Sequence, residues 1–169
     1  MTDETKTNTD LVVAAVAAIN RQDLAALRAM WTPDGTERFP DATCHGVDAI
    51  VAYFEAIFAA IPDLHIDVLA VAADGDSVFL RYEIGGTHTG GPFKGVAPTG
   101  KRIEVPGIDH FTIRDGAIVS NFVVFDQMEI GRQLGLLPPE NSAPDKALKV
   151  LFNGGLAAKG KIKQLRSKT

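Results

Sequence analysis

The segment Lys101–Leu137, KRIEVPGIDHFTIRDGAIVSNFVVFDQMEIGRQLGLL, predicts a β-hairpin followed by a short helix. Two apolar, alternating runs flank Arg114-Asp115-Gly116. An Asp-Gly pair between such runs favours a three-residue loop that ends in a left-handed glycine. With that loop, Ile113 is expected to pair with Ala117.

This register places seven residues on one face of the hairpin, because successive strand side chains alternate between faces. They are Asp109, Phe111, Ile113, Val119, Asn121, Val123 and Phe125. All are apolar except Asp109 and Asn121, which are expected to face each other directly. A carboxylate and an amide on an apolar face predict either a buried hydrogen bond or the floor of a ligand pocket. A two-residue loop would shift the register by one residue and break this pairing.

Length and composition indicate one globular domain. The chain has 169 residues, of which 46% are apolar and 22% charged, as is typical of soluble proteins. No apolar run reaches the ~18 residues of a membrane span. The polar N-terminus does not resemble a secretory signal, so we expect a cytoplasmic location. The single cysteine, Cys44, excludes an internal disulfide and a cysteine-rich metal site.

Charge is distributed unevenly along the chain. The net charge is −4, yet all seven ionisable residues after Asp145 are basic, which leaves a net charge of −11 before them. We expect residues 139–169 to form a basic, helical extension, interrupted at Gly154-Gly155, that docks on the acidic body of the protein. An anionic surface such as nucleic acid or membrane is the alternative. We expect no nucleic-acid partner, because aromatic residues do not interleave with the basic ones.

The order of elements predicts an α+β fold. Residues 1–8 are expected to be disordered. Helices are expected over residues 10–20, after Asp23 up to the turn at Pro33-Asp34-Gly35, and from Gly46 to Ile61. Strands are expected at residues 36–39, 64–72 and 77–84 and in the hairpin. Helices followed by an antiparallel meander predict helices packed on one face of a curved sheet.

Three segments resemble a known family at this order and spacing. They are Phe54–Leu64 (FEAIFAAIPDL), Gly86–Gly100 (GTHTGGPFKGVAPTG) and the hairpin with its DQMEIGRQLGLLPP ending. Together they resemble the SnoaL-like polyketide or ester cyclases of the nuclear-transport-factor-two-like superfamily. The resemblance implies a cone over residues 9–138, in which three helices pack on a bent antiparallel sheet and enclose a pocket. It also implies dimers formed through the sheet and chemistry without a cofactor.

The chain departs from that family at the expected site. The resemblance implies a histidine where this chain has Asp109 and a catalytic aspartate where it has Val123. The cyclase acid/base is therefore missing at its own position, and Asp109 is the best replacement. The related epoxide hydrolases use the same missing aspartate with an arginine and an aspartate on a preceding strand. Arg81-Tyr82-Glu83 resembles that pair only in part, and a solvated strand face is the simpler interpretation of Arg81 and Glu83.

Asp109 and Asn121 are the predicted catalytic residues. Burial would raise the pKa of Asp109 towards the range that suits a general base at neutral pH. Asn121 would orient it or bind a substrate carbonyl. The alternative is a structural hydrogen-bonded pair. The expected substrate-binding residues are Arg38, Trp31, Tyr53, Phe58, Phe111, Val123 and Phe125. Arg38 would bind a carboxylate or enolate oxygen, with a surface position as its alternative, and the helical aromatics could equally be core.

No metal site or cofactor is expected. The four histidines are His45, His65, His88 and His110, and no two have the i, i+4 spacing of a helical zinc site. His88 lies in the glycine-rich bend of the family-like segment, where we expect a structural role. No serine or cysteine lies in a nucleophile motif.

The leading hypothesis is a cofactor-free enzyme for a small apolar carbonyl compound such as a polyketide, steroid or terpenoid. It would abstract a proton next to the carbonyl and lead to cyclisation or isomerisation. The rivals are a non-catalytic ligand-binding or dimerisation module, which the missing aspartate at Val123 favours, and an epoxide hydrolase or hydratase. Phe122 and Val124 are expected on the outer face of the sheet, where apolar side chains favour a symmetric homodimer.

Overall fold

The computed structural model describes residues 3–166, with side chains from residue 7 to residue 155. The helices are α1 (Asp3–Asn20), α2 (Leu24–Ala29), α3 (Val47–Ala60), α4 (Gln127–Gln133) and α5 (Ala143–Arg166). The strands are β1 (Trp31–Arg38), β2 (Thr43–His45), β3 (His65–Asp74), β4 (Ser77–Thr87), β5 (Arg102–Arg114) and β6 (Ala117–Phe125).

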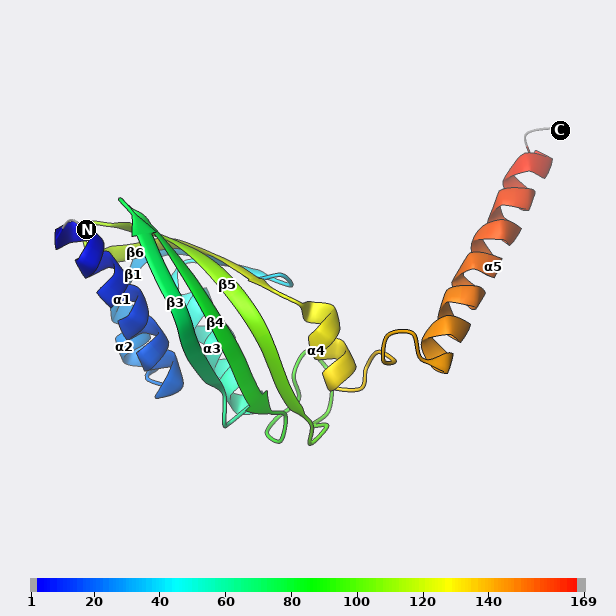
Figure 1. The fold of residues 1–169 in the computed structure, drawn as a ribbon, viewed down its shortest axis with the longest axis horizontal. Helices are drawn as coiled ribbons and strands as arrows, with labels where there is room; N and C mark the ends of the chain where they lie inside the picture. Colours follow the sequence, from blue (N-terminus) through cyan, green and yellow to red (C-terminus); the bar gives the residue numbers. More distant parts are fainter. Residues whose placement is uncertain (1–2, 167–169) are drawn as a thin grey trace.

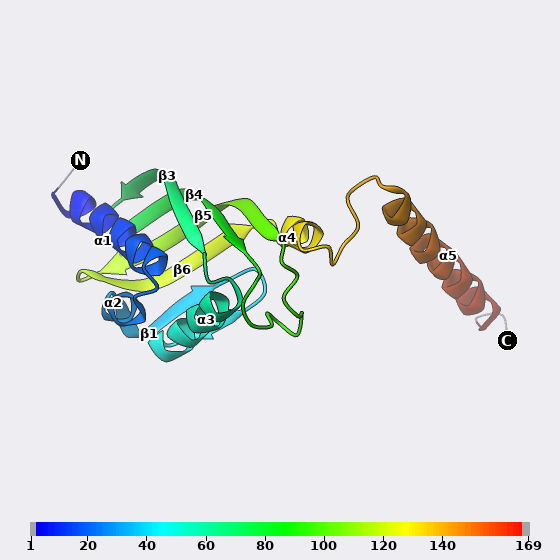
Figure 2. The ribbon, with the colours of Figure 1, turned by 90° about the horizontal axis from the view of Figure 1, so that it is seen from below.

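The six strands form one curved, unclosed sheet in the order β2-β1-β6-β5-β4-β3. Neighbouring strands run antiparallel except β1, which lies parallel to β6. Figure 2 shows α1, α2 and α3 along the same side of this sheet. Apolar side chains of these helices and of the concave sheet face form one core. The α+β cone that the sequence predicts is therefore confirmed.

The turn between β5 and β6 has two residues rather than the expected three. Asp115 and Gly116 both have positive φ angles, of 51° and 73°, which is the geometry of a tight hairpin turn with primed dihedrals. Arg114 pairs with Ala117 across it. The pairing that we expected from a longer loop is wrong.

A bulge follows that turn and restores the predicted faces. The register shifts between the pairs Ile113↔Ile118 and Thr112↔Ser120, which leaves Val119 as the extra residue. Turn and bulge together displace the expected pairing by two residues, and an even displacement keeps each side chain on its face. Asp109 therefore faces Val123 instead of Asn121, but all three remain on the concave side. Near the turn, Ile118 replaces Val119 as the buried residue.

The first helix begins earlier than the sequence predicts. α1 includes residues 3–8, which we expected to be disordered, while residues 1–2 lie outside the described residues. Asn8 and Thr9 are buried, and the Asn8 side-chain amide donates to the carbonyl of Gly75 at 3.2 Å. The first part of α1 thus contacts the turn between β3 and β4 through a polar side chain. Such a contact leaves no apolar stripe in the sequence from which this part of the helix could be predicted.

The segment around Pro33-Asp34-Gly35 belongs to β1 and is not the turn that we expected. Asp23 caps α2 as expected and accepts a hydrogen bond from the Ala26 amide at 2.9 Å. The helix ends at Ala29, and the strand begins at Trp31. The Trp31 ring lies against Gly35, where a Cβ would come within 2.7 Å of the ring. Glycine at this position makes room for the indole, so the strand continues through a segment that locally resembles a turn.

The C-terminal helix α5 does not dock on the body of the protein, and this corrects our expectation. Figure 1 shows it held away from the cone beyond α4. It also runs without interruption through Gly154-Gly155. Within the described part of the chain, no helix is long and apolar enough to cross a membrane.

The glycine-rich bend after β4 closes the end of α3. The amides of Gly90 and Gly91 donate to the carbonyls of Ala60 and Ala59 at 3.0 and 2.6 Å, which satisfies acceptors that a helix end leaves open. His88 is fully buried in the same bend, with Nε2 3.2 Å from the carbonyl of Gly91. These contacts support the structural role that we expected for His88.

Gly90→Ala should destabilise the fold by about 2 kcal/mol, because a Cβ at residue 90 would lie 2.0 Å from the backbone oxygen of Ala59. The matched control is Gly91→Ala, whose Cβ would meet the same oxygen at an ordinary 3.5 Å. Urea unfolding of both variants measures the difference. Equal losses of stability would show that the close packing of the bend on α3 is not the cause.

Candidate functional site

A cavity of about 290 Å³ lies between the helices and the concave face of the sheet. Its walls are mainly aliphatic and aromatic side chains. The cavity reaches the surface where its lining residues are themselves exposed. We call this opening the mouth; it is formed by Asp41, Lys94, Gln127 and Leu136. An apolar cavity with few polar groups is the usual form of a small-molecule site.

Four buried polar side chains from neighbouring strands line one wall of the cavity, and we call them the polar row. They are Glu37 on β1, Asn121 on β6, Asp109 on β5 and Tyr82 on β4. The amide nitrogen of Asn121 donates to Glu37 Oε1 at 2.8 Å and to Asp109 Oδ2 at 2.9 Å. The Tyr82 hydroxyl donates to Asp109 Oδ1 at 3.0 Å. One amide thus bridges two carboxyl groups.

Strand pairing explains how the row forms. Glu37 and Asn121 are direct partners in the parallel pair β1–β6, whereas Asn121 reaches Asp109 diagonally. Tyr82 is opposite Gly107 on β5, and a Cβ at residue 107 would lie 2.3 Å from the tyrosine ring. The ring can therefore lie across Gly107, which brings its hydroxyl to the carboxylate two residues further along.

The two carboxyl groups of the row have different pKa values. Burial raises the pKa of Glu37 to about 8; the hydrogen bond from Asn121 opposes this rise and the nearby Asp109 charge adds to it. Burial also raises the pKa of Asp109, but hydrogen bonds from Asn121 and Tyr82 limit the rise to about 6. Burial therefore favours the protonated form of Glu37 more strongly than that of Asp109, an arrangement in which the pair shares one proton and one negative charge near neutral pH.

The two carboxyl oxygens of Glu37 have different surroundings. Because Oε1 accepts the amide hydrogen of Asn121, a proton on this carboxyl group would be carried by Oε2. Among the described residues, neither Oε2 of Glu37 nor Oδ1 of Asn121 has a hydrogen-bond partner, although both atoms are buried. Buried polar atoms without partners are uncommon in folded proteins. A bound molecule that accepts a hydrogen bond would satisfy Oε2.

The structure brings most of the predicted site residues together. The cavity lining includes Asp109 and Asn121 together with Trp31, Tyr53, Phe111, Val123 and Phe125. Arg38 and Phe58 are absent from it. The role of each lining residue in binding or catalysis stays a prediction.

Arg38 and Phe58 are placed differently from our expectation. Arg38 lies on the outer face of the sheet, with its guanidinium carbon 5.2 Å from the centre of the Phe122 ring. Phe58 is buried in the core next to Phe54, at a ring-centre distance of 6.0 Å. Arg81 is likewise exposed, on the face opposite Tyr82, which agrees with the simpler interpretation of its strand.

Sequence reasoning missed Glu37. Strand alternation places Glu37 and Arg38 on opposite faces, so the choice of Arg38 as the pocket residue selected the wrong side of β1. Phe39, two residues after Glu37, is apolar and buried, which was the available signal that this side faces the core. The hydroxyl of Tyr82 was missed too, although strand alternation places Tyr82 on the face opposite Arg81 and Glu83.

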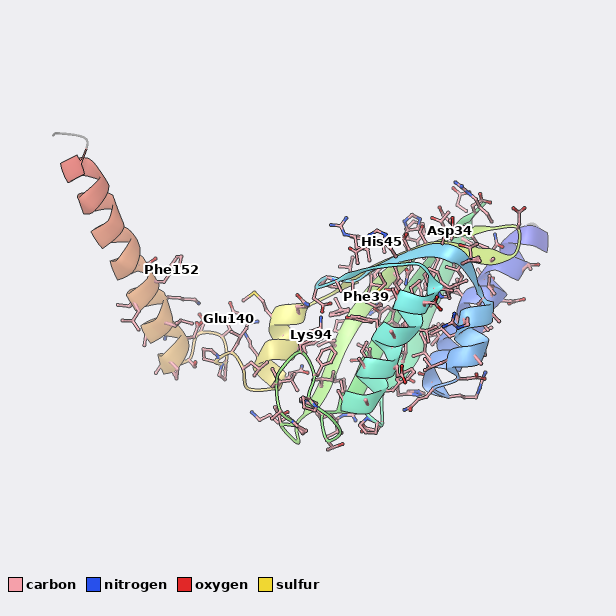
Figure 3. The ribbon with its side chains drawn as sticks, turned by 180° about the vertical axis from the view of Figure 1, so that it is seen from behind. Asp34, Phe39, His45, Lys94, Glu140 and Phe152 are labelled. Carbon is pink, nitrogen blue, oxygen red and sulfur yellow. The ribbon has the colours of Figure 1, made fainter. Side chains whose placement is uncertain are left out.

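Charged and aromatic side chains meet at the mouth. Tyr53 donates its hydroxyl to Asp41 Oδ1 at 3.0 Å, and Lys94 forms an ion pair with Asp41. The ammonium of Lys94 lies 5.5 Å from the centre of the Tyr53 ring, and that ring stacks on Phe39 at 4.0 Å. Figure 3 shows Phe39 and Lys94 at this end of the cone.

Within the described part of the chain, no group of three or more His, Cys, Asp or Glu side chains could hold a metal ion.

Solved structures with the same fold share this architecture. AclR from Streptomyces galilaeus, a candidate hydroxylase, is 31% identical with a TM-score of 0.71, and the match covers 79% of this chain and 99% of that chain. IdmH from Streptomyces antibioticus, a candidate polyketide cyclase, is 27% identical with a TM-score of 0.65, and the match covers 76% and 98%. A protein from Catenulispora acidiphila with a ketosteroid isomerase-like fold is 24% identical with a TM-score of 0.64, covering 74% and 92%, and shows the fold alone.

The chain thus has the cone-shaped, ketosteroid isomerase-like fold. The family model of the SnoaL-like polyketide cyclases matches residues 9–134. The chain therefore belongs to the SnoaL-like polyketide cyclase family. Among curated proteins, none matches it.

Glu37→Gln should remove a pH dependence of stability. Burial raises the pKa of Glu37 in the folded protein to about 8, whereas the ordinary pKa of a glutamate is 4.5. The free energy of unfolding should therefore fall as pH rises through this window, and the variant should gain about 4 kcal/mol relative to wild type between pH 5 and pH 9. Urea unfolding at both pH values measures this gain.

The matched control is Glu55→Gln, an exposed glutamate on α3, which should leave the wild-type slope intact. If Glu37→Gln and wild type keep the same stability difference at both pH values, Glu37 is ionised in the fold.

Proposed function

We propose that this protein is a cofactor-free enzyme that abstracts a proton next to the carbonyl group of a small apolar compound. The observation that carries the proposal is the polar row, in which the carboxyl groups of Asp109 and Glu37 are bridged by the amide of Asn121. Burial raises both pKa values, that of Glu37 further than that of Asp109. Two carboxyl groups whose environments set their pKa values apart are a recurring arrangement for acid/base chemistry. Asp109 is the proposed base, and Glu37 is the proposed acid.

The proposed step leaves atoms and charge balanced. Asp109 takes a proton from the carbon next to the carbonyl, and the electron pair of the broken C–H bond moves onto the carbonyl oxygen. Glu37 gives its Oε2 proton to that oxygen, so an enol forms and the negative charge moves from Asp109 to Glu37. Return of a proton to another carbon gives isomerisation, and attack of the enol carbon on a second carbonyl in the same molecule gives cyclisation.

The lining of the cavity supports an apolar substrate. Aliphatic and aromatic side chains such as Ile19, Leu80 and Phe111 form most of its walls, so binding would be driven by burial of apolar surface. Polyketides, steroids and terpenoids carry a carbonyl on such a skeleton. Membership in the cyclase family favours a polyketide-like compound among these.

A ligand-binding module without catalysis is the alternative. It is favoured by Val123, which stands where the resemblance implies the catalytic aspartate and which is buried on the cavity wall. Epoxide hydrolysis or hydration has less support, because Arg81 lies on the exposed face of β4.

Asp109→Asn should lower proton abstraction by ~10²-fold or more while the fold is retained. The probe is 2-tetralone, an apolar ketone, and the measurement is exchange of its α-protons for deuterium by NMR. Because burial raises the pKa of Asp109, removal of the carboxylate should leave stability at pH 7 unchanged or higher.

Glu55→Gln is the control and should exchange as wild type does. Two results would contradict the assignment of Asp109: exchange at the wild-type rate in Asp109→Asn, or a clear loss of stability in that variant. Wild-type exchange no faster than in buffer, together with saturable binding of the ketone, would favour the ligand-binding alternative.

We also infer that two copies of the chain associate through the outer face of the sheet. That face exposes Phe79, Ile108, Phe122 and Val124, each between 45% and 52% accessible, and isolated proteins rarely expose so much contiguous apolar surface. A cytoplasmic location also stays a prediction.

Light scattering at tens of micromolar should give the mass of a dimer. Ile108→Lys should convert it to a monomer, because the new charge would be buried between the two sheets. Val13→Lys, which changes an exposed side chain on α1, should remain dimeric. A monomeric wild type would overturn this inference.

A further inference from the structure

Helix α5 exposes apolar side chains that nothing in the cone covers. Leu148, Val150, Leu151 and Phe152 are between 54% and 74% accessible. Figure 3 shows Phe152 on the outlying helix, far from Phe39 and Lys94 at the cavity. Leu148, Leu151 and Phe152 are spaced by three and four residues, so they share one face of the helix. A single helix with such a face needs a partner surface.

The charge of α5 indicates what kind of surface that is. Seven basic residues and no acidic ones follow Asp145, whereas the chain before them carries −11. The carboxylate of Asp145 itself is paired with Lys149 at 2.7 Å. An excess of positive charge beside an apolar face fits a surface that is anionic outside and apolar beneath, which is the surface of a bilayer with acidic lipids.

We propose that α5 is an interfacial helix that binds the surface of an anionic lipid bilayer. Leu148, Leu151 and Phe152 enter the boundary between headgroups and acyl chains, and the net positive charge of the chain after Asp145 is attracted to the acidic headgroups. The helix lies along the bilayer and does not cross it, in keeping with its mixed composition. Nucleic acid is a poorer match, because the basic residues of α5 alternate with aliphatic ones and would bring an apolar face to the phosphates.

The position of α5 in the chain connects it to the cavity. Ile130 of α4 and Leu134, the residue that follows this helix, line the cavity wall, and Leu136 lies at the mouth. Residues 137–142 join this point to α5, a reach of ~20 Å when extended. A bilayer that holds α5 therefore keeps the mouth close to the lipid. If the proposed function is right, this places the enzyme where an apolar substrate is concentrated.

Flotation of the full-length protein with lipid vesicles tests the proposal. We expect at least ~10-fold more bound protein with vesicles of phosphatidylcholine and phosphatidylglycerol than with phosphatidylcholine alone, and less binding as salt rises. The double variant Leu151→Gln/Phe152→Gln should lose ~10-fold in binding to the acidic vesicles, because it removes apolar area without changing charge. The matched control is Val13→Gln, on the exposed face of α1, which should bind as wild type does.

Each other outcome overturns the proposal. Wild type that stays unbound to acidic vesicles at low salt excludes it, and so does a double variant that binds as wild type does. A double variant with a smaller mass by light scattering in the absence of lipid would show that the face contacts a second copy instead. Asp109→Asn should float as wild type does, so failure of the catalytic proposal and failure of this one are distinguishable.

Discussion

The register between β5 and β6 is the constraint on which the rest of the site depends. A two-residue turn at Asp115-Gly116 alone would place Asn121 on the outer face, with Phe122 and Val124 turned into the core. The extra residue at Val119 reverses that outcome. One bulge therefore decides which alternate residues of β6 line the cavity and which lie on the outer apolar surface.

The polar row depends on this register, which places Asn121 and Asp109 on the same concave face. Two carboxyl groups on a mainly apolar wall cannot both stay ionised without a large cost. The amide of Asn121 supplies one hydrogen to each carboxyl group. Burial raises the pKa of Glu37 further than that of Asp109, because Asp109 also accepts a hydrogen bond from Tyr82. Val123 is apolar, but the same wall carries two carboxyl groups, from β1 and β5.

The two ends of the chain behave differently with respect to the cone. At the N-terminus, Asn8 anchors a polar helix segment to the turn at Gly75, so α1 becomes part of the body. At the C-terminus, α5 carries an apolar and basic surface that remains exposed. Gln127 of α4 and Leu136 just after it form part of the mouth, and α5 follows α4 in the chain (Figure 1). The mouth and the start of α5 are therefore joined by a short segment.

By itself, the sequence determined the fold class, the curved sheet with its helical cover, and the placement of Asp109 and Asn121 on one concave face. These follow from local signals: apolar periodicity, glycine and proline positions, and an Asp-Gly turn between alternating runs. An error of two residues in the hairpin register did not matter, because strand faces repeat every two residues. Even the missed strand β2 left the architecture intact.

Only the tertiary structure decided the composition of the site. Glu37 reaches Asn121 through a parallel pairing between β1 and β6, which joins residues more than eighty positions apart and leaves no local signal. Arg38 was excluded and Glu37 included by the face that β1 turns to the core. The raised pKa of Glu37 likewise arises from burial between elements, because a pKa depends on the surrounding dielectric and partners. Sequence supplied the groups, and the packing of distant strands decided which of them meet.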